Sequence, residues 1–300
     1  MEEEMSILLF TSNKLGAMLL SELDKRKFYP EVVTYTKGFQ RTALAVDLGV
    51  YRKQFQMSFI ASNSFAESGL PELAGRTAVC VDWTKDFFRD VFGDVIYAHP
   101  SLLPAYRGYS AVTEQFERGV AVSGASFYMH SDRVDAGDII EQKEIRIEFN
   151  DYPSDYFVKY AAVCADFIVE LNRKGLASYE RRPQNEEEAF YLQRKRGRDA
   201  VMDFRRDAFS LYNHIRGYGR PFFGAYFLHN GEKIIVWRAM TEKWQGDYGK
   251  PGSVINVSEE GMEIACGSGT IVLTEIERNG QIYKGDSVSV IASEVKQSQV

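Results

Sequence analysis

Two loops of this sequence carry residues that together could form an acid–base pair. The first, HPSLLPAYRG, begins at His99 and follows an apolar, strand-like segment, 94–98. The second, SDRVDAGD, contains Asp135 and follows another apolar segment, 125–129. An imidazole and a carboxylate at the ends of two strands can transfer protons and stabilise charge on a reacting group. The alternative interpretation is that both segments are structural turns only.

The first loop is stiff, because Pro100 and Pro104 fix the backbone and remove two N–H donors. Open α/β sheets keep their chemistry at the carboxyl ends of the strands. A histidine on a stiff loop at such an edge is therefore a candidate for catalysis.

The segments before these loops predict a Rossmann-like beginning. An apolar strand over 6–10 is followed by leucines at helical spacing from Leu15 to Leu23 and by a strand over 31–36, which is a βαβ unit. The first strand lacks the Gly-x-Gly-x-x-Gly fingerprint, which argues against a dinucleotide pocket there. Further elements are expected as a helix over 43–48, strands over 77–81, 94–98, 123–129 and 138–147, and a long helix that is capped by Ser154 and stopped by Gly175.

A composition shift around 179–188 indicates a linker, and the pattern changes after it. A helix is expected over 208–215, followed by short strands over 225–228, 233–239, 252–257, 261–265 and 270–277. Short strands at this spacing predict a small barrel. The predicted fold is α/β: a Rossmann-like domain over 1–182, a linker over 183–200 and a small β-barrel domain over 201–300.

Composition narrows the function classes. The length of 300 residues favours two domains. The net charge of −6 argues mildly against a nucleic-acid partner. The three cysteines, Cys80, Cys164 and Cys266, show no metal-binding spacing. No apolar run is long enough to cross a membrane, and the acidic start is unlike a signal peptide. We expect a cytoplasmic protein with free thiols, no metal and no membrane partner, of undetermined oligomeric state.

The two loops also carry a family resemblance. HPSLLPAYRG followed by GASFYMHSDRVDAGDII resembles the folate-dependent formyltransferases, which include methionyl-tRNA formyltransferase, the glycinamide ribonucleotide enzyme and sugar-nucleotide N-formyltransferases. The match is dense over 94–142 and loose over 1–83. A second match, with Arg216, Pro221 and KPGSVI from Lys250, is similar to the OB-like carboxyl-terminal domain of some family members.

The resemblance implies transfer of a formyl group from 10-formyltetrahydrofolate, the co-substrate, to an amine. His99 and Asp135 match two members of the family's catalytic trio, and Tyr97 stands at the asparagine position. Tyr97 shares a strand face with His99, so we expect it in the same cleft. It either donates a hydrogen bond, stacks on a ligand or blocks the formyl position. Tyr128 stands where the family commonly has a histidine.

The same resemblance implies two sets of binding residues. The cofactor set is Trp83, Thr84, Lys85, Asp86, Asp132 and Gly137. The acceptor set is Ser101, Arg107, Gly108 and Tyr128. For Trp83 the alternative to stacking on a pterin is a place in the core.

The acceptor is predicted to be a small amine, with an amino-sugar nucleotide as the first choice. The tRNA enzyme of the family carries a basic insertion, and 37–42 shows nothing comparable. The basic run over 193–198 is either a phosphate patch or a solvated domain junction. The alternatives are a methionyl-tRNA formyltransferase-like enzyme and a catalytically silent member that binds folate or nucleotide.

Overall fold

The structure is a computed structural model that describes residues 6–36, 39, 44–61, 76–83 and 94–288. Its contacts divide the chain into two compact units, and each takes more than one stretch of sequence. The first unit is drawn from residues 1–111, 122–147 and 155–192, and the second from residues 112–121, 148–154 and 193–300. The predicted boundaries at 182 and 200 differ from this division, because residues 183–192 pair with the first unit.

The first unit is built on a mixed sheet. Within the described residues the strand order is β3-β2-β1-β4-β5-β7-β8, with neighbours parallel from β3 to β5 and antiparallel from β5 to β8. The strands are β1 (Ile7–Thr11), β2 (Glu31–Tyr35), β3 (Met57–Ile60), β4 (Thr77–Val81), β5 (Asp94–His99), β7 (Val122–Met129) and β8 (Ile139–Arg146). The predicted βαβ opening is confirmed.

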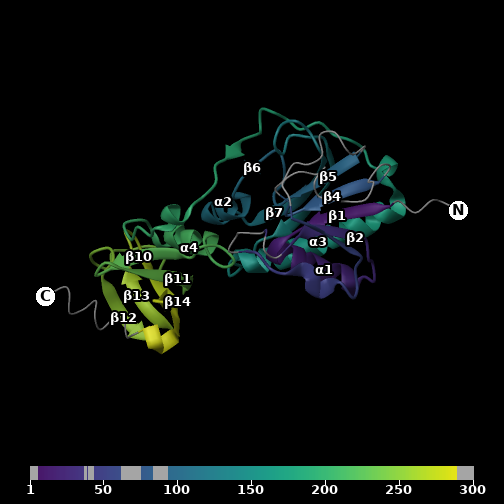
Figure 1. Cartoon of the computed structure of the whole chain (residues 1–300). Coiled ribbons are helices and arrows are strands. Elements are labelled where there is room, and N and C mark those ends of the chain that lie inside the picture. The colour runs from purple at the N-terminus through teal and green to yellow at the C-terminus, as the bar shows by residue number, and fades with distance from the viewer. Residues whose placement is uncertain (1–5, 37–38, 40–43, 62–75, 84–93, 289–300) are drawn as a thin grey trace. The chain divides into compact units, whose positions relative to one another are not determined.

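The centre of this sheet is covered on both faces. Every residue of β1 and β4 is buried, as expected of central strands in a parallel sheet. Helix α1 (Asn13–Lys25) buries its leucine-rich face, and α3 (Pro153–Lys174) lies beside it along the sheet (Figure 1). Arg26 joins the two helices through Asp166, with 2.7 Å between guanidinium and carboxylate.

Two local features differ from the sequence prediction. The helix predicted over 43–48 does not form over 44–47; instead the Asp47 carboxylate accepts the Gly49 N–H and starts a 3-10 helix, η1 (Leu48–Tyr51). Residue 43 lies outside the described residues. The sequence also did not predict the short parallel ladder between β6 (Arg107–Gly108) and β9 (Tyr191–Leu192).

In its described residues the second unit contains an antiparallel sheet, against which helix α4 packs. Its described strands run in the order β10-β11-β14-β13-β12, with β15 paired to β14. The elements are α4 (Ala208–Gly217), β10 (Ala225–His229), β11 (Glu232–Met240), β12 (Val254–Ser258), β13 (Gly261–Ala265), β14 (Thr270–Arg278) and β15 (Gln281–Lys284). The five predicted short strands are confirmed, and β15 is additional. Short 3-10 helices are η2 (Leu176–Ser178) in the first unit and η3 (Gly197–Ala200) and η4 (Gly285–Val288) in the second.

Helix α2 (Ala111–Glu117) belongs to the second unit from residue 112 on, and a charged cluster joins it to the later residues of that unit. The Glu117 carboxylate lies 2.8 Å from His214 Nδ1 and 2.7 Å from Lys195 Nζ. Burial alone would raise the pKa of Glu117, but the hydrogen bonds from His214 and Lys195 outweigh it and lower the pKa. None of the helices in the described part of the chain combines the length and apolar character needed to cross a bilayer.

Candidate functional site

His99 is the last residue of β5 and is held between two oxygen atoms. Its Nε2 lies 2.8 Å from the Tyr106 carbonyl oxygen, and its Nδ1 lies 3.5 Å from Asp135 Oδ2. A carbonyl oxygen can only accept, so Nε2 carries the hydrogen in this contact. The structure thus brings together the imidazole and the carboxylate that the two loops were expected to pair.

Asp135 lies in the β7–β8 loop and receives donors on both carboxylate oxygens. Oδ2 accepts the Gly108 N–H at 2.7 Å and faces His99, and Oδ1 accepts the Tyr128 hydroxyl at 2.5 Å. Asp135 has a φ of 54°, in the left-handed region that non-glycine residues rarely adopt. A carboxylate offers about four lone-pair positions, so one position remains for a further proton or donor.

Tyr97 and Tyr128 face each other across the β5–β7 ladder. Their Cα atoms are paired, and their ring centroids lie 5.9 Å apart with 28° between the planes. Tyr128 is buried; its burial, with the nearby Asp135 charge, raises its pKa well above the ordinary range. Tyr128 therefore remains a hydroxyl donor to Asp135. Tyr97 is half-buried, and its ring also lies 5.7 Å from that of His130.

Trp83 is a core residue. It is buried and stacks on Tyr35, with centroids 4.3 Å apart and planes at 3°, and it forms a T-shaped pair with Phe10 whose ring centroids lie 5.3 Å apart. The structure thus supports the core alternative for Trp83 over stacking on a cofactor. The other predicted cofactor residues after β4, Thr84, Lys85 and Asp86, lie outside the described residues.

The predicted acceptor residue Arg107 is occupied within the protein. Its side chain has no exposed surface, and its guanidinium donates to Gln184, Glu186 and Tyr191. Burial opposes the charge, but the bonds to Glu186 and Tyr191 outweigh it, so the pKa of Arg107 is raised. Its guanidinium donors therefore serve the fold in this arrangement.

The remaining predicted residues contribute mainly through backbone geometry. Ser101 is buried and its hydroxyl donates to the Ala105 carbonyl at 2.8 Å. Gly108 supplies the N–H that Asp135 accepts. Position 137 has no room for a side chain, because a Cβ atom there would lie 1.7 Å from the Met129 carbonyl oxygen. Asp132 is exposed on the same loop.

The structure adds Gln184 and Glu186, which sequence reasoning assigned to a linker. Both contact Arg107 from the segment before β9. The signal that could have found them is Arg107 itself, because a buried guanidinium needs acceptors for its donors.

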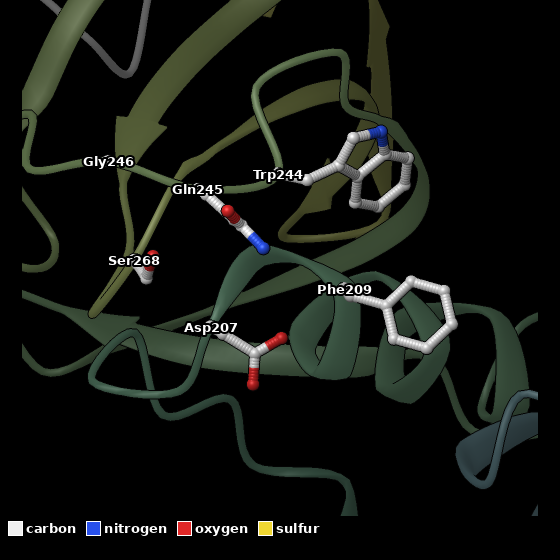
Figure 2. A pocket seen from close by; sticks show the side chains of 6 residues that line it. All are labelled: Asp207, Phe209, Trp244, Gln245, Gly246 and Ser268. Atoms are coloured by element: carbon white, nitrogen blue, oxygen red, sulfur yellow. The ribbon is translucent and has the colours of Figure 1, made fainter.

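The described residues contain no group of three or more histidine, cysteine or acidic side chains arranged to hold a metal ion. A cavity of about 610 Å³ lies in the second unit rather than at the His99–Asp135 pair. Figure 2 shows the Trp244 and Phe209 rings at one end of this cavity and Ser268 at the other. Asp207, also in its lining, is engaged in capping α4 through Ser210.

Two family descriptions match the chain in the order of its two units. Residues 70–170 match "Formyl transferase", and residues 196–288 match "Formyl transferase, C-terminal domain". A methionyl-tRNA formyltransferase of Pseudothermotoga lettingae is 30% identical over 185 residues, which cover 60% of this chain and 58% of that protein. The chain thus spans less than two thirds of the length of that relative.

Solved structures share the fold at low identity. HypX from Aquifex aeolicus, crystallised with tetrahydrofolic acid, is 17% identical with a TM-score of 0.66, covering 98% of this chain and 48% of that one. The Helicobacter canadensis N-formyltransferase, in complex with folinic acid and dTDP-3-aminofucose, is 16% identical with a TM-score of 0.65, covering 90% and 98%. Given the two matched domains in sequence order and the paired histidine and aspartate, the chain belongs to the formyl transferase family.

Proposed function

We propose that this protein transfers a formyl group from 10-formyltetrahydrofolate to the amine of a small acceptor, with an amino-sugar nucleotide as the leading candidate. The observation that carries the proposal is the contact between His99 and Asp135 at the edge of the sheet, at 3.5 Å. Folate compounds in the structures of HypX and the Helicobacter canadensis enzyme support the choice of co-substrate.

The proposed reaction is an attack by the unprotonated amine on the formyl carbon. A C–N bond to the amine forms and the carbonyl oxygen becomes negatively charged. The bond between the formyl carbon and the folate nitrogen then breaks, and the proton that the amine gave up passes from Asp135 to that nitrogen. His99 donates a hydrogen bond from Nε2 to that oxygen, which takes the place of the Tyr106 carbonyl as acceptor. Asp135 accepts the amine proton at its remaining lone-pair position and stabilises the charge on the imidazole.

Tyr97 completes the proposed site at the position of the family's asparagine. It lies beside Tyr128 on the strand that ends in His99. We keep the three roles open: a hydroxyl donor to the formyl oxygen, a stacking surface, or a block on the formyl position. For the cofactor we retain Asp132 and Gly137 near Asp135.

A small acceptor is favoured over tRNA by charge. The chain has a net charge of −6, and within the basic run over 193–198 Lys195 is neutralised by Glu114 and Glu117, at 3.0 and 2.7 Å. The curated relatives that act on methionyl-tRNA make the tRNA the second candidate. Phosphate recognition needs unpaired cations, which this pairing removes at Lys195.

We further propose that the second unit is an OB-like barrel behind a Rossmann-like catalytic domain. Its six short antiparallel strands and the KPGSVI segment support this assignment. The free, buried cysteines Cys80, Cys164 and Cys266 favour a reducing compartment, so we place the protein in the cytoplasm.

The test is tetrahydrofolate release from 10-formyltetrahydrofolate with a panel of dTDP-amino sugars and with methionyl-tRNA. Transfer to a sugar amine that is lost in His99→Ala and retained in His229→Ala, a histidine of the second unit, supports the proposal. Preference for methionyl-tRNA selects the second candidate. Folate binding without transfer to any amine leaves a silent binding protein.

A further inference from the structure

A segment predicted as linker crosses the two catalytic loops. We call residues 182–192 the strap. At one end Arg182 pairs with Ile139: the Ile139 N–H donates to the Arg182 carbonyl oxygen at 2.8 Å, and the Arg182 N–H donates to the Ile139 carbonyl oxygen at 2.9 Å. At the other end β9 pairs in parallel with β6, so that Arg107 lies opposite Tyr191. The strap therefore runs from the loop that carries Asp135 to the loop that follows His99.

Gln184 is the side chain that joins these loops. Its Oε1 accepts from Arg107 Nε at 3.1 Å and from Arg107 Nη2 at 2.8 Å. Its Nε2 donates to the carbonyl oxygens of Asp135 at 2.9 Å and Gly137 at 2.7 Å. The amide thus uses its two donors and both lone pairs of its oxygen. The opposite amide orientation would aim N–H groups at the guanidinium, so these partners fix it.

Glu186 anchors the strap electrostatically. Its carboxylate binds Arg107 Nη2 at 2.9 Å and also contacts Arg133, in the same loop as Asp135. Hydrogen bonds from Arg107 and then Arg133 lower the pKa of Glu186 to about 2. The strap therefore stays charged and attached throughout the neutral range.

We infer that Gln184 is a positioning residue that sets the distance between Asp135 and His99. Asp135 has a left-handed φ of 54°, and its carbonyl oxygen accepts a hydrogen bond from the Gln184 amide at 2.9 Å. Strained backbone persists where surrounding contacts determine it. The amide nitrogen of Gln184 holds this backbone, and its amide oxygen holds the Arg107 guanidinium. The residue after Arg107, Gly108, donates its N–H to the Asp135 carboxylate. The inference rests on the proposed function for its kinetic part.

The test uses Gln184→Glu, which keeps the shape but turns an oxygen toward two carbonyls. Asn185→Asp is the matched control, since it makes the same amide-to-carboxylate change on the adjacent exposed residue. In Gln184→Glu we expect kcat to fall by about 10- to 100-fold with KM for 10-formyltetrahydrofolate within about threefold, as for displaced supporting contacts. We expect the Gly108 amide to exchange hydrogen at least about tenfold faster, because its acceptor moves.

The amide-exchange measurement keeps the inference separate from the proposed function. If the wild-type protein shows no formyl transfer but Gly108 exchanges faster in Gln184→Glu, the positioning role is supported and the proposed function is contradicted. Gly108 exchange and kcat both unchanged in Gln184→Glu overturn the inference. An equal loss in Asn185→Asp also overturns it, because the effect would then come from charge alone. If Gln184→Glu does not fold, Glu186→Gln loosens the same strap and is expected to show the same two changes at smaller size.

Discussion

The hydrogen bond from Tyr128 to Asp135 gives the sharpest prediction, through Tyr128→Phe. The bond is 2.5 Å long, Tyr128 is 5% exposed, and the Asp135 side chain is 13% exposed. A hydrogen bond to a charged group contributes about 1.5–3 kcal/mol to stability, and burial favours the upper part of this range. Removing the hydroxyl leaves Oδ1 without this donor, while the Gly108 N–H still holds Oδ2.

The assay is a double-mutant cycle of unfolding free energies with Tyr128→Phe and Asp135→Asn. We expect a coupling energy of about 1.5–3 kcal/mol. Turnover in Tyr128→Phe should fall about tenfold, or about 1.4 kcal/mol of barrier, because one of two anchors remains. Tyr248→Phe, at a tyrosine of the second unit, serves as control. A coupling energy below about 0.5 kcal/mol would refute the assignment of Tyr128 as the residue that holds Asp135.

The other predictions concern the acid–base pair, its neighbour and two carboxylates. His99→Ala and Asp135→Asn should each lower turnover at least about 100-fold while the protein stays folded at the assay temperature; a change below about tenfold would contradict their roles. If Tyr97 donates to the formyl oxygen, Tyr97→Phe should raise the barrier to turnover by about 2–4 kcal/mol. If Tyr97 stacks on a ligand, Tyr97→Phe should be neutral and Tyr97→Ala should weaken ligand binding. Rapid turnover by the wild-type protein would exclude a Tyr97 that blocks the formyl position. Burial raises the pKa of Asp82 to about 7. The free energy of unfolding should therefore fall by at most about 4 kcal/mol as pH rises from about 4 to about 7. Asp82→Asn should abolish this fall when unfolding is measured across the same pH range. The pKa of Glu186 is lowered to about 2, so its stabilisation is present above about pH 4 and is lost as pH falls toward 2, and Glu186→Gln should flatten that acid limb.

The strands and the pair of loops could be predicted, because both depend on local pattern. Apolar runs such as β1 and β4 have the composition of buried strands, and the position of His99 after such a run places it at the sheet edge. The position of His99 needs no knowledge of distant partners. The contact to Asp135 could not be derived in this way, because β5 and β7 are antiparallel: His99 is paired with Ser126, and the end of β7 lies beside Ile96. The loop after β7 has to return along the strand to bring Asp135 to His99.

The supporting contacts could not be predicted, because they depend on loop geometry or on residues far apart in sequence. Tyr128 reaches Asp135 because the loop after β7 folds back toward its own strand, which the residue types do not reveal. Gln184 lies 77 positions from Arg107 in a polar stretch that has the composition of a linker. Trp83 stacks on Tyr35 because β2 and β4 flank β1, which a tryptophan at a strand end does not reveal.

The contacts of Glu117 with His214 and Lys195 limit where this chain can be cut to exchange one of its units for a foreign domain. A chimaera that exchanges everything after residue 192 for a foreign domain keeps Glu117 but removes both His214 and Lys195. Glu117 would then lose both of the cationic partners that hold its carboxylate in the native chain. The crossover point for domain exchange therefore has to include residues 112–121 with the carboxyl-terminal piece, and evolutionary shuffling of the two halves would face the same constraint.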